Sequence, residues 1–209
     1  MKLLIFGPTG GTGLRLVAQA LEQRHAVTAF ARSPAKLAPE RTGLAVVEGD
    51  VLDAAAVERA VPGHEAVLCA VGAPASDRRT LRTDATRNII RAMETHGVKR
   101  LVCLSSLGFG DTRNMLPFVM RYIVVPLFLR RAFADHALQE ELVKQSGLDW
   151  IIARASALTD GPRTGVYRHG FPVTEKGTRL KISRADVADF MLKQLTSDEY
   201  LRQTPGLSY

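Results

Sequence analysis

Cysteine is scarce in this sequence, which holds only two among its 209 residues. Cys69 and Cys103 each fall within an apolar run typical of a strand. We therefore expect both to be reduced thiols in the core of a cytoplasmic protein. Neither has neighbours at the spacing that metal ligands need, so we expect no metal site.

Long hydrophobic runs are also missing. A membrane-spanning helix needs about 18 or more consecutive apolar residues, and the most apolar stretch, residues 116–129, is shorter and is interrupted by Arg121 and Pro126. The first apolar run ends at Gly7, which is too early for a signal peptide. With 46% hydrophobic residues the composition is that of a globular protein. We expect a single cytoplasmic domain over residues 1–209 without a membrane span.

Acidic residues are outnumbered by basic ones, 21 against 28, which gives a net charge of +7. Arginines cluster over residues 78–91 and again at Arg130 and Arg131. No nucleic-acid-binding motif accompanies them, so we expect no nucleic-acid partner. We interpret the charge as a basic surface that serves anionic cofactors and small-molecule substrates. A solvated basic surface without such a role is the alternative.

The N-terminal stretch carries the clearest functional pattern. Apolar residues 3–6 predict a short buried strand, and the apolar spacing of residues 14–21 predicts a helix. A glycine-rich turn between a strand and a helix is typical of dinucleotide binding. The residues of this turn that we expect to contact the cofactor are Gly7, Thr9, Gly10, Gly11, Thr12 and Gly13. A glycine-rich turn that binds nothing is the alternative.

Each glycine of the turn has an expected role. Gly7 permits the tight turn, Gly10 lets the backbone approach a pyrophosphate, and Gly13 lets the helix pack close to the strand. The N-terminus of the helix adds unpaired N–H donors for the phosphates.

The end of the next predicted strand, residues 25–31, indicates which cofactor binds. An acidic side chain about 20 residues past the glycines would bind a ribose 2′-hydroxyl, but none stands between Val27 and Ala38. Arg32, Ser33 and Lys36 stand there instead and suit a 2′-phosphate. We therefore predict NADP(H) as cofactor. Solvated loop cations are the alternative.

The rest of the chain alternates strand and helix patterns. Strands are expected over residues 43–49, 65–71, 99–104 and 149–154, and helices over residues 54–61, 81–96, 134–146 and 184–195. Asp53 and Ser183 are the expected N-caps of two of these helices. This alternation predicts an α/β fold, a Rossmann-type doubly wound parallel sheet flanked by helices, with a small C-terminal portion on the substrate side. Val71 and Gly72 end a central strand, where such sheets bind ligands.

Five segments together resemble a known family. They are GPTGGTGL, FARSPAKL, VEGDVLD, LVCLSS and SGLDWIIARASALTDGPRTG. They are similar to the atypical short-chain dehydrogenases/reductases of the NAD(P)H-binding, NmrA-like group, and most to its flavin reductase or biliverdin reductase B type. The resemblance implies hydride transfer from NADPH to a flavin, or to another flat conjugated acceptor such as a quinone or a linear tetrapyrrole.

The resemblance also assigns roles to residues. It implies that Asp50 and Val51 lie along the adenine, and that Ser106, with Ser105 before it, lies beside the nicotinamide. Ser106 is then the catalytic residue, which orients the reactants rather than acting as a strong acid. The loop formed by Arg154, Ala155 and Ser156 would line the other side of the nicotinamide.

The chain departs from the family at two points. Where biliverdin-type enzymes have Pro-Pro-His, this chain has Ala155, Ser156 and Ala157, so a substrate contact is missing. The apolar segment 116–129 is also longer than the corresponding segment of the biliverdin-type enzymes.

The Tyr-x-x-x-Lys pair of standard short-chain enzymes is absent as well. Proline, phenylalanine and threonine follow Tyr122, Tyr167 and Tyr200 at the lysine's spacing. This absence disfavours alcohol and ketone chemistry by that route.

The function and the place of the apolar segment each have an alternative interpretation. The chain could be a regulator of the NmrA-like type that binds the dinucleotide without turnover. For residues 116–129 we expect a helix packed on the protein's own core, and a lid over the substrate or a subunit interface are the alternatives.

His136 and Glu140 share a helix face and are expected to be a pair at the surface or the cleft edge.

Overall fold

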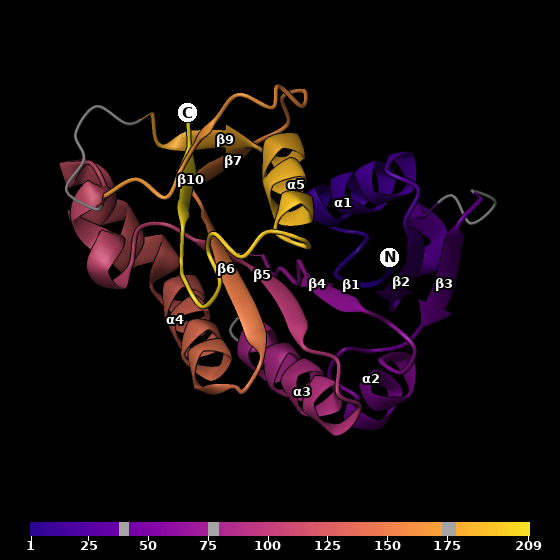
Figure 1. Ribbon diagram of the computed structural model, residues 1–209. Helices are drawn as coiled ribbons and strands as arrows, with labels where there is room; N and C mark the ends of the chain where they lie inside the picture. The colour runs from indigo at the N-terminus through magenta and orange to yellow at the C-terminus, as the bar shows by residue number, and fades with distance from the viewer. Residues whose placement is uncertain (38–41, 75–79, 173–178) are drawn as a thin grey trace.

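The computed structural model describes residues 1–37, 42–74, 80–172 and 179–209, so Arg78 and Arg79 lie outside the described residues. It confirms the predicted Rossmann-type fold, a large sheet flanked by helices on both faces (Figure 1). The strand order is β3-β2-β1-β4-β5-β6-β10-β8. Neighbouring strands run parallel except β10 and β8 at one edge. The strands are β1 Lys2–Phe6, β2 Ala26–Ala31, β3 Leu44–Glu48, β4 Ala66–Cys69, β5 Arg100–Ser106, β6 Asp149–Ala155, β8 Arg168–His169 and β10 Gly206–Ser208.

Two helical layers cover the sheet. The helices are α1 Gly11–Glu22, α2 Ala54–Ala60, α3 Leu81–Thr95, α4 Arg130–Gln145 and α5 Arg184–Lys193. Figure 1 shows α1 and α5 above the sheet and α2, α3 and α4 below it. Side chains alternate between these layers along each strand. In β1, for example, Leu3 and Ile5 pack in the core on the α1 and α5 side, whereas Leu4 and Phe6 pack with α2 and α3.

The sheet reverses its direction of growth at β1. This strand pairs with β2 on one side and with β4 on the other. In parallel sheets of this kind, ligands bind outside the carboxyl ends of the strands at such a point. The carboxyl ends of β1 and β4 lie next to each other here, because Phe6 and Cys69 are partners in the register.

Several local predictions are confirmed. The Asp53 side chain accepts hydrogen bonds from the backbone N–H groups of Ala55 and Ala56 and so caps α2. The Ser183 side chain accepts from the N–H group of Asp186 and caps α5. Cys69 and Cys103 are buried partners on β4 and β5.

Two boundaries differ from the prediction. Helix α1 begins at Gly11, inside the glycine turn, because the N–H groups of the turn already belong to its first residues. Strand β4 ends at Cys69, so Val71 and Gly72 follow the strand instead of ending it.

The C-terminal part adds a small layer beside the sheet. Strands β7 Ala157–Thr159 and β9 Lys181–Ser183 form a separate parallel pair. Helix α5 follows β9 directly and packs against α1. This placement brings the start of α5 to the edge of the sheet at which β6 ends.

The prediction that residues 116–129 pack on the core is wrong. After the short helix η2 Gly110–Met115, this stretch forms the wide π-helix η3 Met120–Leu129. None of its residues is buried. Pro126 lies inside η3 and has no N–H group to donate, which disfavours a regular α-helix there. The residues of η3 are half-buried or exposed instead.

No helix among the described residues combines the length and the apolar character needed to cross a membrane.

Candidate functional site

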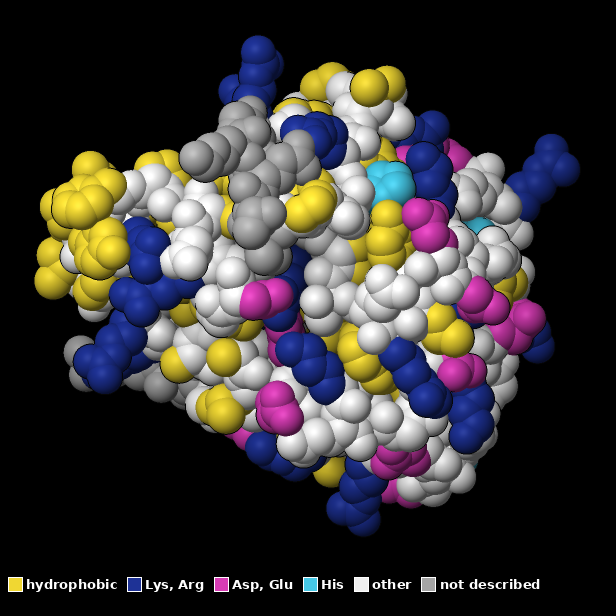
Figure 2. All heavy atoms as spheres, turned by 60° about the vertical axis from the view of Figure 1, so that its left-hand side comes forward, with side chains coloured by type: hydrophobic (Ala, Val, Ile, Leu, Met, Phe, Trp, Pro, Cys, Tyr) yellow, Lys and Arg dark blue, Asp and Glu magenta, His cyan; other side chains and the backbone are white. Residues whose placement is uncertain are grey.

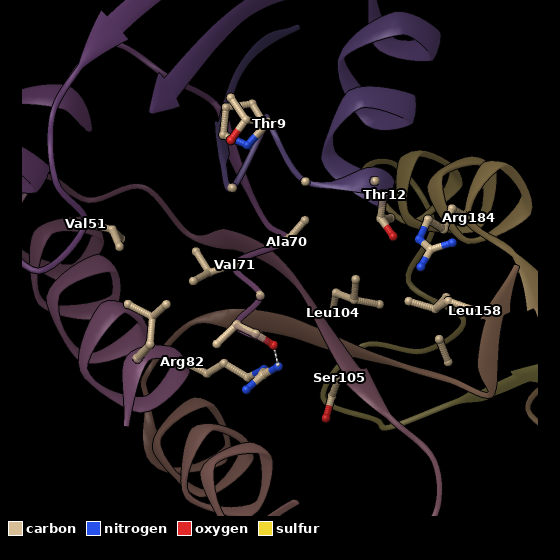
Figure 3. Close-up of a pocket in the computed structure, with 18 of the residues that line it drawn as sticks. Thr9, Thr12, Val51, Ala70, Val71, Arg82, Leu104, Ser105, Leu158 and Arg184 are labelled. Atoms are coloured by element: carbon tan, nitrogen blue, oxygen red, sulfur yellow. Dashed lines mark hydrogen bonds between the residues drawn. The ribbon is translucent and has the colours of Figure 1, made fainter. Parts of the chain in front are cut away.

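A cavity of about 530 Å³ lies at the carboxyl ends of the central strands. This volume is in the range of small-molecule sites. Figure 3 shows side chains from separate elements around one space, with Thr9 and Thr12 from the glycine turn on one side and Arg82 and Ser105 on the other. The predicted site residues that line the cavity are Gly7, Thr9, Gly10, Gly11, Thr12, Arg32, Val51, Val71, Gly72, Ser105, Ser106, Ala155 and Ser156.

The structure leaves five predicted residues outside the lining of this cavity, and they are Gly13, Ser33, Lys36, Asp50 and Arg154. Gly13 was predicted to permit close packing, and its position fits that role. A Cβ atom at Gly13 would collide with the carbonyl oxygen of Gly7. The other four are described with their neighbours below.

The glycine turn is tightly packed at Gly7 and open toward the cavity at Gly10. Gly7 has φ +75°, and a Cβ atom there would collide with the carbonyl oxygen of Ala70. Gly10 differs, because a Cβ atom there would meet only the carbonyl oxygen of Gly7, at 3.5 Å. Gly10 is also the N-cap of α1 and lines the cavity. The turn therefore presents a helix N-terminus to a space that a phosphate group can enter.

A polar side chain at the other end of the cavity also points to a ligand. The hydroxyl oxygen of Ser156 is buried and has no hydrogen-bond partner among the described residues, although Ser156 lines the cavity. Buried hydroxyl groups normally have a partner. The turn at Gly10 and this hydroxyl together fit an elongated polar molecule such as a dinucleotide.

The rim beyond the glycine turn carries the predicted phosphate-binding residues. Arg32 lines the cavity with a side chain that is 58% exposed, and its Nη1 atom lies 3.9 Å from Oδ2 of Asp50. The other oxygen of Asp50 accepts from the N–H group of Leu52 and stabilises the turn after β3. Ser33 and Lys36 are exposed at the short helix η1 Pro34–Lys36, outside the lining. Arg32 is thus the cation of this group that the structure brings to the cavity.

The two serines at the end of β5 face different surroundings. Ser105 is buried, and its hydroxyl donates to Oε1 of Glu140 over 2.8 Å. Ser106 is less buried, and its hydroxyl donates to the carbonyl oxygen of Leu107 over 3.0 Å. Ser106 must therefore release a local bond before its hydroxyl can donate to a ligand.

Arg154 does not line the cavity, contrary to the prediction. Its guanidinium donates to both oxygens of Glu140, from Nε over 2.9 Å and from Nη2 over 2.6 Å. A third bond from Nη1 reaches Oδ1 of Asp111 over 2.7 Å. The side chains of Arg154 and Glu140 are both almost completely buried. Burying an unpaired guanidinium would be unfavourable in free energy. Arg154 therefore pairs with the Glu140 carboxylate on α4 and does not face the cavity.

His136 is half-buried at the edge of the cavity, which agrees with the cleft-edge position expected for it. It lines the cavity, its Nδ1 atom lies 3.4 Å from the hydroxyl oxygen of Ser105, and its ring stacks on Phe109 at 6.1 Å between centroids. Burial, reinforced by the Arg82 cation, lowers the pKa of His136 to about 4. The imidazole is therefore neutral near pH 7, with one nitrogen as donor and one as acceptor. Glu140, which shares its helix face, is buried, so of the two expected places the cleft edge is confirmed and the surface is not.

A neutral His136 predicts sensitivity to acid. The pKa of 6.5 expected in the unfolded chain lies above the folded value, so the unfolded chain takes up this proton first as the pH falls. The free energy of unfolding should decrease by up to about 1.4 kcal/mol per pH unit between about pH 6.5 and about pH 4. Urea unfolding across this range should show a smaller decrease for His136→Asn than for the unchanged protein. The exposed His96→Asn is the matched control, and equal acid sensitivity of His136→Asn and the unchanged protein would contradict the assignment.

Sequence reasoning missed two arginines and a leucine in the lining, Arg82, Arg184 and Leu158. Arg82 donates from Nη2 to the carbonyl oxygen of Ala73 (Figure 3). Arg184 donates to Asp160, and its side chain lies close to Gly11. Arg82 and Arg184 lie in the first turns of α3 and α5. Because such helices start after a strand ends, their first residues are natural candidates for this edge of the sheet.

The described residues contain no cluster of three or more His, Cys, Asp or Glu side chains that could hold a metal ion.

A family model described as NAD(P)H-binding matches residues 7–198. The chain belongs to this NAD(P)H-binding family. The match extends from the glycine turn past α5 and so includes every residue that lines the cavity. An NAD(P) cofactor follows from this match.

Individual relatives agree with the family and its fold. The photosystem II assembly factor Ycf39 of Synechocystis is 26% identical over 98% of this chain, and the chain spans 61% of the length of that relative. A short-chain dehydrogenase/reductase from Veillonella parvula, solved in complex with NADP, has a TM-score of 0.84 at 18% identity and covers 100% of this chain, with 94% of its own chain matched. ChuY of Escherichia coli O157:H7, an anaerobilin reductase, has a TM-score of 0.81 at 24% identity and coverages of 100% and 97%.

Proposed function

We propose that this member of the family is an NADPH-dependent reductase of flavins and similar flat conjugated acceptors. The proposal rests on one observation above all. The cavity continues from the glycine turn to the ends of β5 and β6, and the described residues that line it include no tyrosine. A bound NADPH supplies a hydride, and the chain itself binds and orients the reactants.

The tyrosines are engaged elsewhere, which supports an acceptor that needs no strong acid from the protein. Tyr167 donates its hydroxyl proton to Asp189, and Tyr209 donates to Asp186. Burial and the bond to Asp189 raise the pKa of Tyr167. Tyr200 lies against His169. A ketone would need a proton donor at its oxygen, whereas the N5 atom of a flavin accepts hydride and the remaining proton can come from water.

The far end of the cavity has the character that a flat ring system requires. Leu104, Ala155 and Leu158 supply apolar contacts, while Ser106 and His136 supply polar ones. We assign Ser106 the role of orienting the ring that receives the hydride. Ser156, whose hydroxyl has no partner among the described residues, would bind the nicotinamide side.

The decisive experiment follows absorbance at the nicotinamide band while the purified protein, NADPH and FMN are mixed. Steady loss is expected with FMN, and Ser106→Ala should reduce the turnover rate roughly tenfold or more with little change in NADPH affinity. Ser197→Ala, which changes a serine in the turn after α5, is the matched control. Tight NADPH binding with no turnover on flavins, quinones or biliverdin would refute the reductase proposal and favour a regulator that only binds the dinucleotide.

The preference for NADPH over NADH is assigned to Arg32. Replacing Arg32 by alanine removes the cation at the rim of the cavity, and a charge-assisted hydrogen bond of this kind contributes about 1.5–3 kcal/mol. The Kd for NADPH should therefore rise roughly tenfold or more, while the Kd for NADH should hardly change. Lys36→Ala should have a smaller effect, because Lys36 lies outside the lining. Equal losses for both cofactors in Arg32→Ala would contradict the assignment.

A further inference from the structure

The segment around η3 exposes an unusual amount of apolar surface. Phe118, Leu127 and Phe128 are 72%, 70% and 67% exposed. Val119, Tyr122 and Ile123 lie between them and are also exposed. We call these six residues the apolar lobe. Figure 2 shows a group of hydrophobic side chains that stands out from the surface at the left edge of the molecule. Contiguous apolar surface of this kind marks a place where something else binds.

The charged residues within and next to the apolar lobe in the sequence are all basic, up to Asp111 on one side and Asp135 on the other. Residues 112–134 contain four arginines and no acidic residue. Arg113, Arg130 and Arg131 are exposed, and the guanidinium of Arg121 lies over the ring of Tyr122 at 5.0 Å. Figure 2 shows Lys and Arg side chains next to the protruding hydrophobic group. Apolar side chains flanked by arginines are the combination that binds the surface of an anionic membrane.

We propose that the apolar lobe docks this protein onto an anionic lipid surface. The aromatic and aliphatic side chains would enter the boundary between headgroups and acyl chains, and the arginines would bind the lipid phosphates. This contact is peripheral and needs no membrane-spanning helix. It stands independently of the reductase proposal, because it uses none of the residues that line the cavity.

Charge complementarity favours this occupant over a second copy of the chain. Two lobes facing each other in a symmetric dimer would bring eight arginines together with no acid from residues 112–134, as each copy contributes four. Like charges at close range oppose such an association. The net charge of +7 of the whole chain acts in the same direction. An anionic lipid surface satisfies both the apolar and the cationic parts of the lobe.

The lobe is connected to the cavity through the chain after β5. Leu116 packs beside Gly108, and Phe109 stacks on His136, which lines the cavity. The membrane-facing surface and the acceptor end of the cavity thus belong to neighbouring segments. An acceptor dissolved in the lipid would have a short path to the site.

Sedimentation with lipid vesicles tests the docking. The full chain is mixed with vesicles of phosphatidylcholine, alone or with about 30% phosphatidylglycerol, at low and high salt. Binding is expected with the anionic vesicles only, and it should decrease strongly at about 0.5 M salt because the charges are then screened. Phe128→Ser should weaken binding about tenfold or more, through the loss of buried apolar area. The double variant Arg130→Ala, Arg131→Ala should weaken it roughly thirtyfold.

Matched control variants distinguish the effect of the apolar lobe from the effect of losing the same charge or an exposed apolar side chain elsewhere. Arg59→Ala combined with Arg91→Ala removes the same charge from exposed positions on α2 and α3, and Val47→Ser removes an exposed apolar side chain from β3. Both controls should bind vesicles nearly as well as the unchanged protein. NADPH affinity and Tm, measured for every variant, show whether the protein is still folded.

Two results would overturn the docking proposal. One is equal binding, or no binding, to neutral and anionic vesicles. The other is a dimer in analytical ultracentrifugation that Phe128→Ser dissociates, without vesicle binding, which would assign the lobe to a subunit interface. Both results are independent of NADPH oxidation, so failure of the docking and failure of the reductase proposal remain distinguishable.

Discussion

Replacing Gly10 by valine is expected to abolish NADPH binding while leaving the fold intact. Gly10 is the glycine of the turn at which a Cβ atom makes only one ordinary contact, 3.5 Å from the carbonyl oxygen of Gly7. The backbone there is extended, with φ −74°, which any residue can adopt. The added methyl groups would therefore enter the cavity, where the cofactor's pyrophosphate is expected. We expect the Kd for NADPH to rise about a hundredfold or more, since the phosphates lose the N–H groups at the start of α1.

Two other glycines provide the comparison for this variant. Gly147→Val makes the same change at the exposed turn before β6, far from the cavity, and should alter neither Kd nor Tm by much. Gly13→Ala should instead lower Tm, because its Cβ atom would collide with the carbonyl oxygen of Gly7. Fluorescence titration with NADPH and thermal unfolding of the three variants separate these effects. Unchanged NADPH affinity in Gly10→Val would place the cofactor elsewhere.

The parts of the molecule that sequence reasoning predicted well depend on local patterns. The strand before Gly7, the turn and α1 follow one another without interruption, so their arrangement is fixed by neighbours in the chain. The same holds for the caps at Asp53 and Ser183, where a side chain bonds an N–H group two or three residues later. The parallel arrangement of the central strands follows from the alternation of strands and helices.

The parts that were missed depend on partners far apart in the sequence. Arg154 was placed beside the nicotinamide because its loop was, but its partners are Glu140 on α4 and Asp111 after β5. His136 was expected at the cleft edge, but its contacts with Phe109 and Ser105 on other elements were not. Such contacts are decided by tertiary packing, which composition and periodicity do not encode.

The prediction for the apolar segment 116–129 was wrong for a different reason. Hydrophobicity predicted burial, yet η3 has apolar residues on every side, so one face can pack on the protein while another stays outside. Phe118 and Phe128 are exposed even though the sequence around them is the most apolar in the chain. Hydrophobic composition alone therefore did not predict which of these residues are exposed.

Replacing Arg154 by alanine is expected to destabilise the protein by about 3–5 kcal/mol. Arg154 and Glu140 form a buried pair with two hydrogen bonds, and their side chains are 5% and 2% exposed. Removing the guanidinium leaves the Glu140 carboxylate buried with Ser105 and the half-exposed Lys144 as its remaining partners. For a chain of this size the loss corresponds to a decrease in Tm of roughly 10 °C or more.

Arg87→Ala provides a matched control for this loss. Arg87 pairs with Asp84 on the surface of α3, and both side chains are about half exposed. Surface pairs contribute at most about 1 kcal/mol, so the control should lower Tm by only a few degrees. Because Glu140 holds Ser105, and Ser105 lies beside His136, Arg154→Ala should also reduce turnover in protein that is still folded. Equal Tm values for the two variants would show that the buried pair contributes no more than an exposed one, whereas a large difference would show that it stabilises the fold beside Ser105 and His136.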